Sequence, residues 1–198
     1  MPYRFIFKID GVTHFQCKLE SLRCLAIKED GQRCKNHCVM GVQLCWVHLL
    51  YKHNLRIKST NSVPQPNGKG LFALNPIEDG DAILFRRNET IIRYNGQHIN
   101  ETELNRRYGD DTAPYTVEYK KGHFIDAACK RGIGSLANHR PSRLANAKFV
   151  LTRSRQTNRI DGVKLVATKS IRNDTEIFVN YGREYKFRDR GTNETVGF

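Results

Sequence analysis

The sequence predicts a mostly β domain of many short strands, preceded by a small cysteine-rich unit. Brief β-favouring runs alternate with turn residues through the last two thirds of the chain, whereas five of the six cysteines lie before residue 46. A polar stretch with two prolines separates the two regions. We therefore expect a Cys/His zinc-binding segment at 1–58, a linker at 59–67, a main domain at 68–185 and a tail at 186–198.

Each element of the main domain is expected between turn signals such as Asp79-Gly80 and Asn173-Asp174. The expected strands are 71–74, 82–85, 90–94, 148–151, 163–167 and 175–179, and a hairpin joins 115–119 to 123–127 around Lys121-Gly122. One helix is expected. Asn100 suits its N-cap, Glu101 and Glu103 suit its positive start, and Gly109 suits its C-cap.

Composition excludes several classes of protein. The 198 residues hold 33 Lys plus Arg and 20 Asp plus Glu, a formal net charge of +13, and 39% are hydrophobic, which is too many for a disordered chain. No apolar run approaches the roughly 20 residues that span a bilayer, and the first ten residues lack the apolar core of a secretory signal. We therefore expect an intracellular protein, nuclear or cytoplasmic, that is neither secreted nor bound in a membrane.

The spacing Cys24-x9-Cys34-x10-Cys45-x2-His48 predicts a zinc site. Zinc takes four Cys or His ligands in a tetrahedron, and a segment too small for a large core gains folding free energy from such a metal. Trp46, between the last two ligands, is expected to pack against the unit. Three alternatives stay open: disulfides, buried cysteines without metal, or a quartet that includes Cys17, His37 or Cys38.

A series of motifs follows the linker in a fixed order. They are Gly68-Lys69-Gly70-Leu71-Phe72-Ala73, Ile91-Ile92-Arg93-Tyr94-Asn95-Gly96, Phe124-Ile125-Asp126-Ala127, Gly134-Ser135-Leu136-Ala137-Asn138-His139 and Glu176-Ile177-Phe178-Val179-Asn180-Tyr181-Gly182. In this order they resemble the SET-domain protein lysine methyltransferases, of the compact viral or microbial type. The resemblance implies a β-clip-like arrangement of short strands in which the segment around Asn138 threads beneath the closing tyrosine segment as a pseudoknot.

The resemblance also implies S-adenosylmethionine as cofactor and protein lysine N-methylation as activity. By similarity, the residues that line the cofactor are Gly68, Lys69, Gly70, Leu71, Phe72, Asn138, His139 and Tyr181. Tyr181 matches the catalytic tyrosine. Tyr115 is a candidate wall of the lysine channel, with Tyr119 as the alternative because the strand register is open, and Cys129 is expected to be structural.

Methyl transfer sets physical demands on such a site. Donor and acceptor must be aligned within about 3–3.5 Å with water excluded. The attacking lysine must also lose its proton, although an exposed lysine has a pKa near 10.4. A narrow apolar channel beside a sulfonium lowers that pKa through desolvation and like charge.

The expected partner is a protein with a target lysine, histone or nucleosome in the first place. A net charge of +13 would repel an isolated basic tail but attract nucleic acid, so DNA contact through a basic surface is expected. That surface would include Arg140, Arg143, Arg153, Arg155 and Arg159. The alternatives are a non-histone substrate, or a zinc-dependent binding module whose SET domain is inactive. The chain departs from many chromatin members because it lacks their pre-SET and post-SET cysteine motifs.

Overall fold

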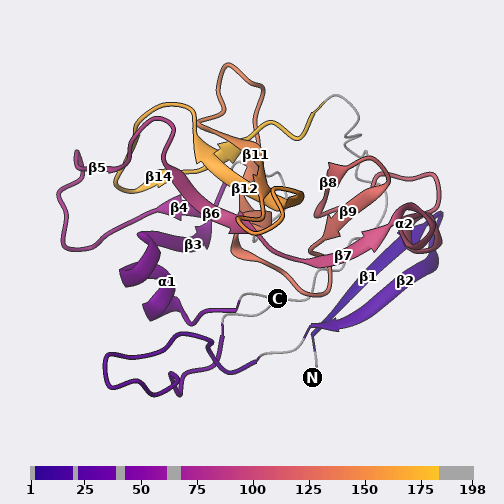
Figure 1. Cartoon of the computed structure of the whole chain (residues 1–198), viewed down its shortest axis with the longest axis horizontal. Helices are drawn as coiled ribbons and strands as arrows, with labels where there is room; N and C mark the ends of the chain where they lie inside the picture. Colours follow the sequence, from indigo (N-terminus) through magenta and orange to yellow (C-terminus); the bar gives the residue numbers. More distant parts are fainter. Residues whose placement is uncertain (1–2, 20–21, 39–42, 62–67, 183–198) are drawn as a thin grey trace.

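Short strands dominate the computed structural model of the chain, which describes residues 3–19, 22–38, 43–61 and 68–182 (Figure 1). In chain order the elements are β1 (Tyr3–Ile9), β2 (Val12–Leu19), α1 (Trp46–His53), β3 (Leu55–Ser59), β4 (Lys69–Ala73), β5 (Ile83–Phe85), β6 (Thr90–Tyr94), β7 (Gln97–Asn100), α2 (Glu101–Tyr108), β8 (Thr116–Lys120), β9 (His123–Asp126), the 3₁₀ helix η1 (Ile133–Leu136), β10 (Asn138–His139), β11 (Ala147–Arg153), β12 (Ile160–Ala167), β13 (Ile171–Arg172), β14 (Thr175–Glu176) and β15 (Phe178–Val179). The predicted mostly β fold is therefore confirmed. In the described part of the chain, no helix is long and apolar enough to cross a membrane.

The strands form several small sheets around one main core. The largest sheet of the described residues has the order β10-β15-β11-β12-β6, and the others are β14-β4-β3, β7-β9-β8, β13-β5 and β1-β2. Leu71, Leu165, Ile177 and Val179 are fully buried in the main core, although they come from strands far apart in the sequence. Burial of these apolar side chains brings the first and last motifs of the domain together.

The closing segment of the domain lies between two earlier strands. β15 runs parallel to β10 on one side and to the first residue of β11 on the other. The buried Asn146 spans this junction, because its Nδ2 donates to the Glu176 carbonyl and its Oδ1 accepts from the Phe178 N–H, both at 2.8 Å. This threading confirms the predicted pseudoknot.

One expected strand is divided in the structure. The strand predicted at 175–179 becomes β14, which pairs with β4, and β15, which pairs with β10. Ile177 between them is fully buried, and its N–H donates to the Leu71 carbonyl at 2.7 Å. A run of β-favouring residues does not reveal that its two halves belong to different sheets.

The predicted helix is confirmed with its caps. The Asn100 side chain accepts from the Glu103 N–H at 2.9 Å, and Gly109 follows the last residue of α2. β8 and β9 form the predicted hairpin. The linker expected at 59–67 falls largely outside the described residues, although Ser59 belongs to β3 and the Thr60 N–H donates to the Gly68 carbonyl at 3.0 Å. The tail at 186–198 also lies outside them.

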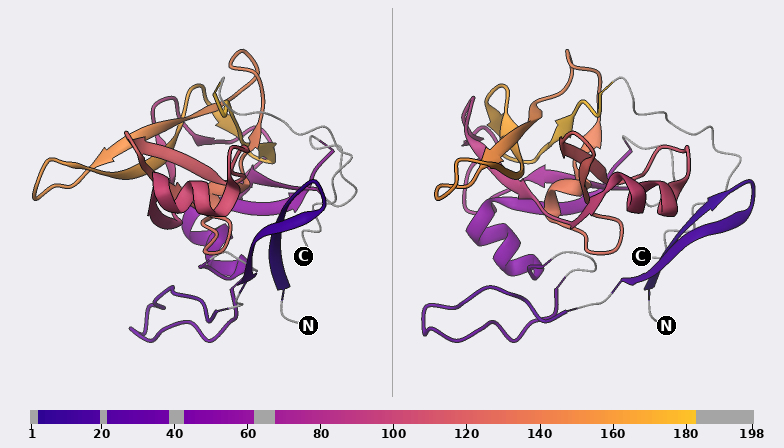
Figure 2. Two further views of the ribbon diagram at one scale, coloured as in Figure 1. Left: turned by 90° about the vertical axis from the view of Figure 1, so that its right-hand side faces the viewer. Right: turned by 45° about the vertical axis from the view of Figure 1, so that its right-hand side comes forward.

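An N-terminal hairpin that the sequence analysis missed lies beside α2 (Figures 1 and 2). β1 and β2 turn at Asp10 and Gly11, which both have positive φ, so the Asp-Gly pair was an available hairpin signal. Phe5 and Phe7 of this hairpin pack with Tyr108 of α2 in a second, smaller core. Residues 3–19 therefore support the main domain and stand apart from the cysteine cluster.

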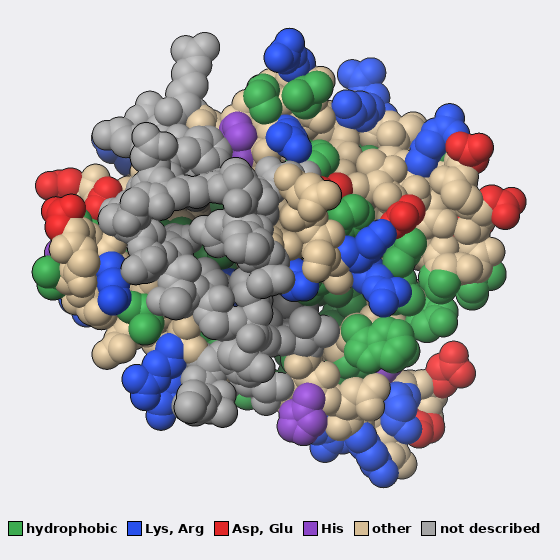
Figure 3. Space-filling view, turned by 180° about the vertical axis from the view of Figure 1, so that it is seen from behind, with side chains coloured by type: hydrophobic (Ala, Val, Ile, Leu, Met, Phe, Trp, Pro, Cys, Tyr) green, Lys and Arg blue, Asp and Glu red, His purple; other side chains and the backbone are tan. Residues whose placement is uncertain are grey.

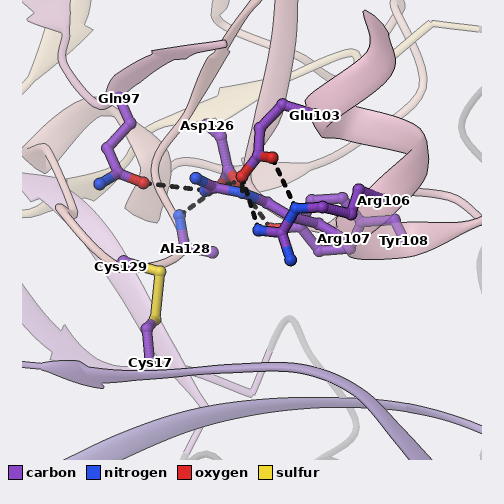
Figure 4. Close-up of a disulfide and its surroundings, with 9 residues drawn as sticks. All are labelled: Cys17, Gln97, Glu103, Arg106, Arg107, Tyr108, Asp126, Ala128 and Cys129. Atoms are coloured by element: carbon purple, nitrogen blue, oxygen red, sulfur yellow. Dashed lines mark hydrogen bonds and ion pairs between the residues drawn. A yellow bond between two sulfur atoms is a disulfide. The ribbon is translucent and has the colours of Figure 1, made fainter. Parts of the chain in front are cut away.

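A disulfide joins this hairpin to the main domain (Figure 4). Cys17 of β2 is bonded to Cys129, 112 residues further along the chain, so Cys17 is not available as a metal ligand. The structural role predicted for Cys129 agrees with this bond. Beside it, the fully buried Asp126 accepts from Arg107 Nη1 and the Tyr108 hydroxyl, both at 2.8 Å.

Candidate active site and metal centre

The segments that the resemblance assigned to the cofactor meet at one place. Asn138 Nδ2 donates to the Lys69 carbonyl at 3.0 Å and to Glu176 Oε1 at 2.9 Å. The other carboxylate oxygen of Glu176 accepts from the Thr60 hydroxyl at 2.6 Å. A Cβ on Gly70 would stand 2.3 Å from Glu176 Oε1, so residue 70 must be glycine for this carboxylate to approach.

The other residues predicted to line the cofactor around Gly70 differ in burial. Leu71 is fully buried in the main core, and its carbonyl accepts from the Ile177 N–H at 2.7 Å, so it offers no exposed surface to a ligand. Phe72 is half-buried, and Lys58 Nζ lies 4.7 Å above its ring. Gly68 is half-buried at the start of the segment.

Tyr181 is anchored at both its backbone and its hydroxyl. Its hydroxyl donates to the Ala137 carbonyl at 2.9 Å, and its N–H donates to His139 Nδ1 at 3.1 Å. The rings of His139 and Tyr181 meet edge to face at 5.3 Å. Burial, and then the charge of Arg140, lower the pKa of His139 below its ordinary value, which keeps the ring neutral and Nδ1 able to accept.

Tyr115 lies just before β8, one residue outside the strand in which the sequence placed it. Its φ is 60°, an uncommon conformation for a non-glycine residue. Its carbonyl accepts from the Tyr94 hydroxyl at 2.7 Å and from the Ala127 N–H at 2.9 Å. The alternative, Tyr119, lies elsewhere in the sheet, with its hydroxyl 3.2 Å from His98 Nδ1.

Tyr94 belongs to the site but was not singled out from the sequence. It is 4% exposed, and its ring meets Phe149 edge to face at 5.7 Å. Burial raises its pKa well above the ordinary range, and the nearby phenol of Tyr181 adds to the rise. The Tyr94-Asn95-Gly96 motif was the available signal, but one buried tyrosine in a strand reads as core in the absence of structure.

The predicted metal ligands form a compact cluster. Cys24, Cys34, Cys45 and His48 place their ligand atoms within 4.8 Å of one another. His48 Nδ1 lies 3.2 Å from Cys45 Sγ and 3.7 Å from Cys24 Sγ. Three thiols and an imidazole at this separation suit tetrahedral zinc.

The alternative ligands Cys38 and His37 are not in this group of ligand atoms, and their properties differ from those of the predicted ligand Cys45. Burial raises the pKa of Cys45, but hydrogen bonds from the His48 N–H and ring and from Asn36 bring it down to about 6, which favours the thiolate that binds metal. Burial, and then repulsion by neighbouring thiolates, raise the pKa of Cys38 to about 11. His37 is exposed.

Two Arg-Cys repeats frame the cluster. Arg23 donates to the carbonyls of Cys34 and Arg33, and Arg33 donates to the carbonyls of Cys24 and Arg23, at 2.7–2.9 Å. These bonds hold the two ligand loops against each other. The packing role expected for Trp46 is wrong, because this side chain is 59% exposed.

A short-strand β fold with a threaded closing segment and an anchored tyrosine defines the SET class of domain. The SET domain family profile matches residues 68–182, and the chain belongs to this family. No curated protein sequence matches the chain.

Solved structures are similar in fold. One is Chaetomium thermophilum PRC2 in complex with H3K27me3 and H3K27M, at 24% identity and a TM-score of 0.50 over 65% of this chain and 14% of that chain. Another is the same complex in an autoinhibited conformation bound to S-adenosylmethionine, at 22% identity and a TM-score of 0.51 over 67% of this chain and 16% of that chain. The chain therefore spans about a seventh of the length of these relatives.

Proposed function

We propose that this protein is an S-adenosylmethionine-dependent protein lysine N-methyltransferase. The observation that carries the proposal is the convergence of Lys69, Asn138 and Tyr181 at the pseudoknot of a SET fold. One of the structures similar in fold contains S-adenosylmethionine, which supports the same cofactor here.

The residues present fit this cofactor. The segment from Gly68 to Phe72, with Asn138 and His139, would hold it, because Gly68, Lys69, Phe72, Asn138 and His139 are half-buried and Asn138 bonds to the Lys69 carbonyl. When bound, S-adenosylmethionine would supply a methyl group on a sulfonium: after the target ammonium has lost a proton to solvent, the amine lone pair would form the N–C bond as the S–C bond breaks to leave a neutral thioether.

The role of Tyr181 follows from its anchoring. Its hydroxyl hydrogen is directed at the Ala137 carbonyl, so the phenol oxygen can act toward an incoming amine as an acceptor. Tyr94, whose phenol is near that of Tyr181, and the Phe149 ring that packs on Tyr94 supply apolar surface, which excludes water and disfavours a charged amine.

Transfer of a radiolabelled methyl group from the cofactor into proteins of a cell extract tests the activity. We expect labelling by the wild type and a loss of at least about 100-fold in Tyr181→Phe, since removal of one positioned group typically costs that much. Tyr119→Phe is the matched control and should stay active. No labelling by metal-replete wild type that binds the cofactor would instead favour a binding module with an inactive SET domain.

The substrate is proposed to be histone, presented in a nucleosome. One structure similar in fold holds histone H3 species, and the net charge of +13 favours a partner that contains DNA. Labelling of histone bands in the extract supports this substrate, whereas a labelled band of another protein would replace it.

DNA contact is proposed through five arginines on and near the β11–β12 hairpin, which projects from the molecule (Figure 2); four of them are exposed and Arg140 is half-buried. They are Arg140, Arg143, Arg153, Arg155 and Arg159. Seen from behind the view of Figure 1, Lys and Arg side chains are spread mainly around the periphery of the molecule (Figure 3). Activity on nucleosomes but not on free histone tails should fall as salt rises, and equal salt-independent activity on both would exclude DNA contact. Such a substrate implies action in the nucleus or cytoplasm.

A further inference from the structure

Arg131 is a buried charge that the proposed mechanism has not used. It lies between β9 and η1, is 3% exposed, and its Nε and Nη2 are buried without a hydrogen-bond partner among the described residues. Buried arginines are usually paired, because an uncompensated buried charge lowers stability by several kcal/mol. A buried guanidinium that lowers stability in this way is expected to serve a function.

The loop that carries Arg131 is fixed on both sides. Asp126 Oδ1 accepts from the Ala128 N–H at 2.8 Å, and the next residue, Cys129, is bonded to the N-terminal hairpin (Figure 4). After Arg131, a Cβ on Gly132 would stand 2.5 Å from the Asn95 carbonyl oxygen, so this backbone is held closely against its neighbour. The position of Arg131 is therefore determined by the fold.

The guanidinium faces the tyrosines of the site. Its central carbon lies 4.1 Å from the centre of the Tyr115 ring. The backbone of the same Tyr115 has a positive φ, and its carbonyl accepts from the Tyr94 hydroxyl, so this backbone is fixed next to Tyr94. Tyr94 is close enough to both Tyr181 and Arg131 for their charges to act on its phenol.

Few other charged groups lie near Arg131 and the tyrosines that it faces. The titratable and charged groups here are Tyr94 of β6, Tyr115 before β8, Asp126 of β9, Arg131 and Tyr181 after β15. The Asp126 carboxylate is already paired with Arg107 at 2.8 Å. The phenols are neutral at physiological pH, so Arg131 remains the one unneutralised charge of this described group.

We propose that Arg131 is an electrostatic positioning residue whose buried positive charge favours the neutral, reactive amine of the target lysine. A fixed like charge disfavours an ammonium ion, and its effect is strong where neither water nor a counter-ion screens it. The inference rests on the proposed methyltransferase function. Arg131 transfers no proton itself; it lowers the cost of the proton loss to solvent that precedes methylation.

The test is the pH dependence of methyl transfer to acid-extracted core histones or, if the extract assay marks another protein, to that protein. In Arg131→Met, the pH at which the methylation rate rises should shift upward. The rate at pH 8 should then fall about tenfold for each pH unit of this shift, and at a pH of about 10 it should nearly return to the wild-type rate. Arg131→Gln should show the same shift, because charge and not shape is responsible. Lys130→Met removes a charge from the adjacent, exposed residue and should leave the profile in place.

Thermal unfolding gives a readout that does not depend on substrate. Because Arg131→Met replaces an unpaired buried charge with an apolar side chain of similar length, it should unfold at the wild-type temperature or above it. Unchanged pH profiles in both Arg131 variants, or lower unfolding temperatures in both, would overturn the inference and leave Arg131 a structural residue. A wild type that binds the cofactor but methylates nothing would refute the proposed function instead.

Discussion

At residue 70 the side chain is limited to a hydrogen atom by a carboxylate of the same chain. Glu176 cannot easily turn away from a new Cβ, because Asn138 and Thr60 both donate to it. We expect Gly70→Ala to lower the free energy of unfolding by about 1–3 kcal/mol and to weaken cofactor binding. Thermal unfolding and calorimetry with S-adenosylmethionine measure the two effects.

The matched control is Gly80→Ala. A Cβ there meets nothing within 4 Å, and the residue has no positive φ, so the variant should be neutral or slightly more stable. Equal losses in both glycine variants would mean that the Glu176 contact does not limit residue 70.

His139 should give cofactor binding an acid limb. Its folded-state pKa is lowered, first by burial and then by Arg140, so the neutral ring stabilises the fold above its ordinary pKa of about 6.5 and this contribution is lost as pH falls below it. Protonation of Nδ1 would also break its bond from the Tyr181 N–H. Calorimetry with S-adenosylmethionine between about pH 5 and 8 should show weaker binding at the acid end.

The control for this effect is His139→Asn, which keeps a hydrogen-bond acceptor that does not titrate in this range. The acid limb should flatten in this variant. If it persists unchanged, another group is responsible for it.

Site residues were predictable from sequence where a motif fixed their order, and not where burial decided their role. Asn138, His139 and Tyr181 were predicted in this way, and the structure brings their segments together. Tyr94 was missed because a buried strand tyrosine has no periodic signature. Arg131 was missed because its isolation from counter-ions depends on contacts far along the chain.

Among the elements, α1 connects the Cys/His cluster to the SET domain. It begins directly after Cys45 and contains His48, while Leu49 on the same helix is buried in the main core. β3 follows at once and pairs with β4, the strand that carries Gly70. Loss of a metal from this cluster should therefore disturb the position of β4 and weaken cofactor binding.

We expect a zinc chelator to lower the unfolding temperature and to weaken S-adenosylmethionine binding, because metal binding contributes to folding. Metal analysis should find one zinc per chain, and Cys34→Ser should lose it. Cys38→Ser is the matched control from the same loop and should retain the metal. Retention by Cys34→Ser with loss by Cys38→Ser would exclude the proposed quartet.

Element types were more predictable than element partners. Helix α2 could be placed to the residue because its N-cap side chain and C-cap glycine act locally. The sheet order β10-β15-β11 could not be derived from local signals, since it depends on which strands bury their faces together. The resemblance implied only that the segment around Asn138 threads beneath the closing tyrosine segment. α1 was missed because its first three residues, Trp46 to His48, belong to the Cys45-x2-His48 pair, which the sequence analysis treated only as part of a metal site.

For the molecule as a whole, the Cys17–Cys129 disulfide links the N-terminal hairpin covalently to the main domain. It spans 112 residues, and closure of a loop this long stabilises a fold by about 3–5 kcal/mol where chain entropy dominates. We expect a reductant, with zinc present, to lower the unfolding temperature of the wild type. The double variant Cys17→Ala/Cys129→Ala should start at that lower temperature and be insensitive to the reductant.

The same reduction should separate stability from catalysis. The loop after β9 is also held by the Asp126 carboxylate and by the close approach of Gly132 to Asn95, and neither contact involves sulfur. Arg131 should therefore keep its place on Tyr115 after reduction, and the pH profile of methyl transfer should stay where it is. A profile that moves with reduction, in step with the unfolding temperature, would show that the hairpin and not the loop holds the buried charge.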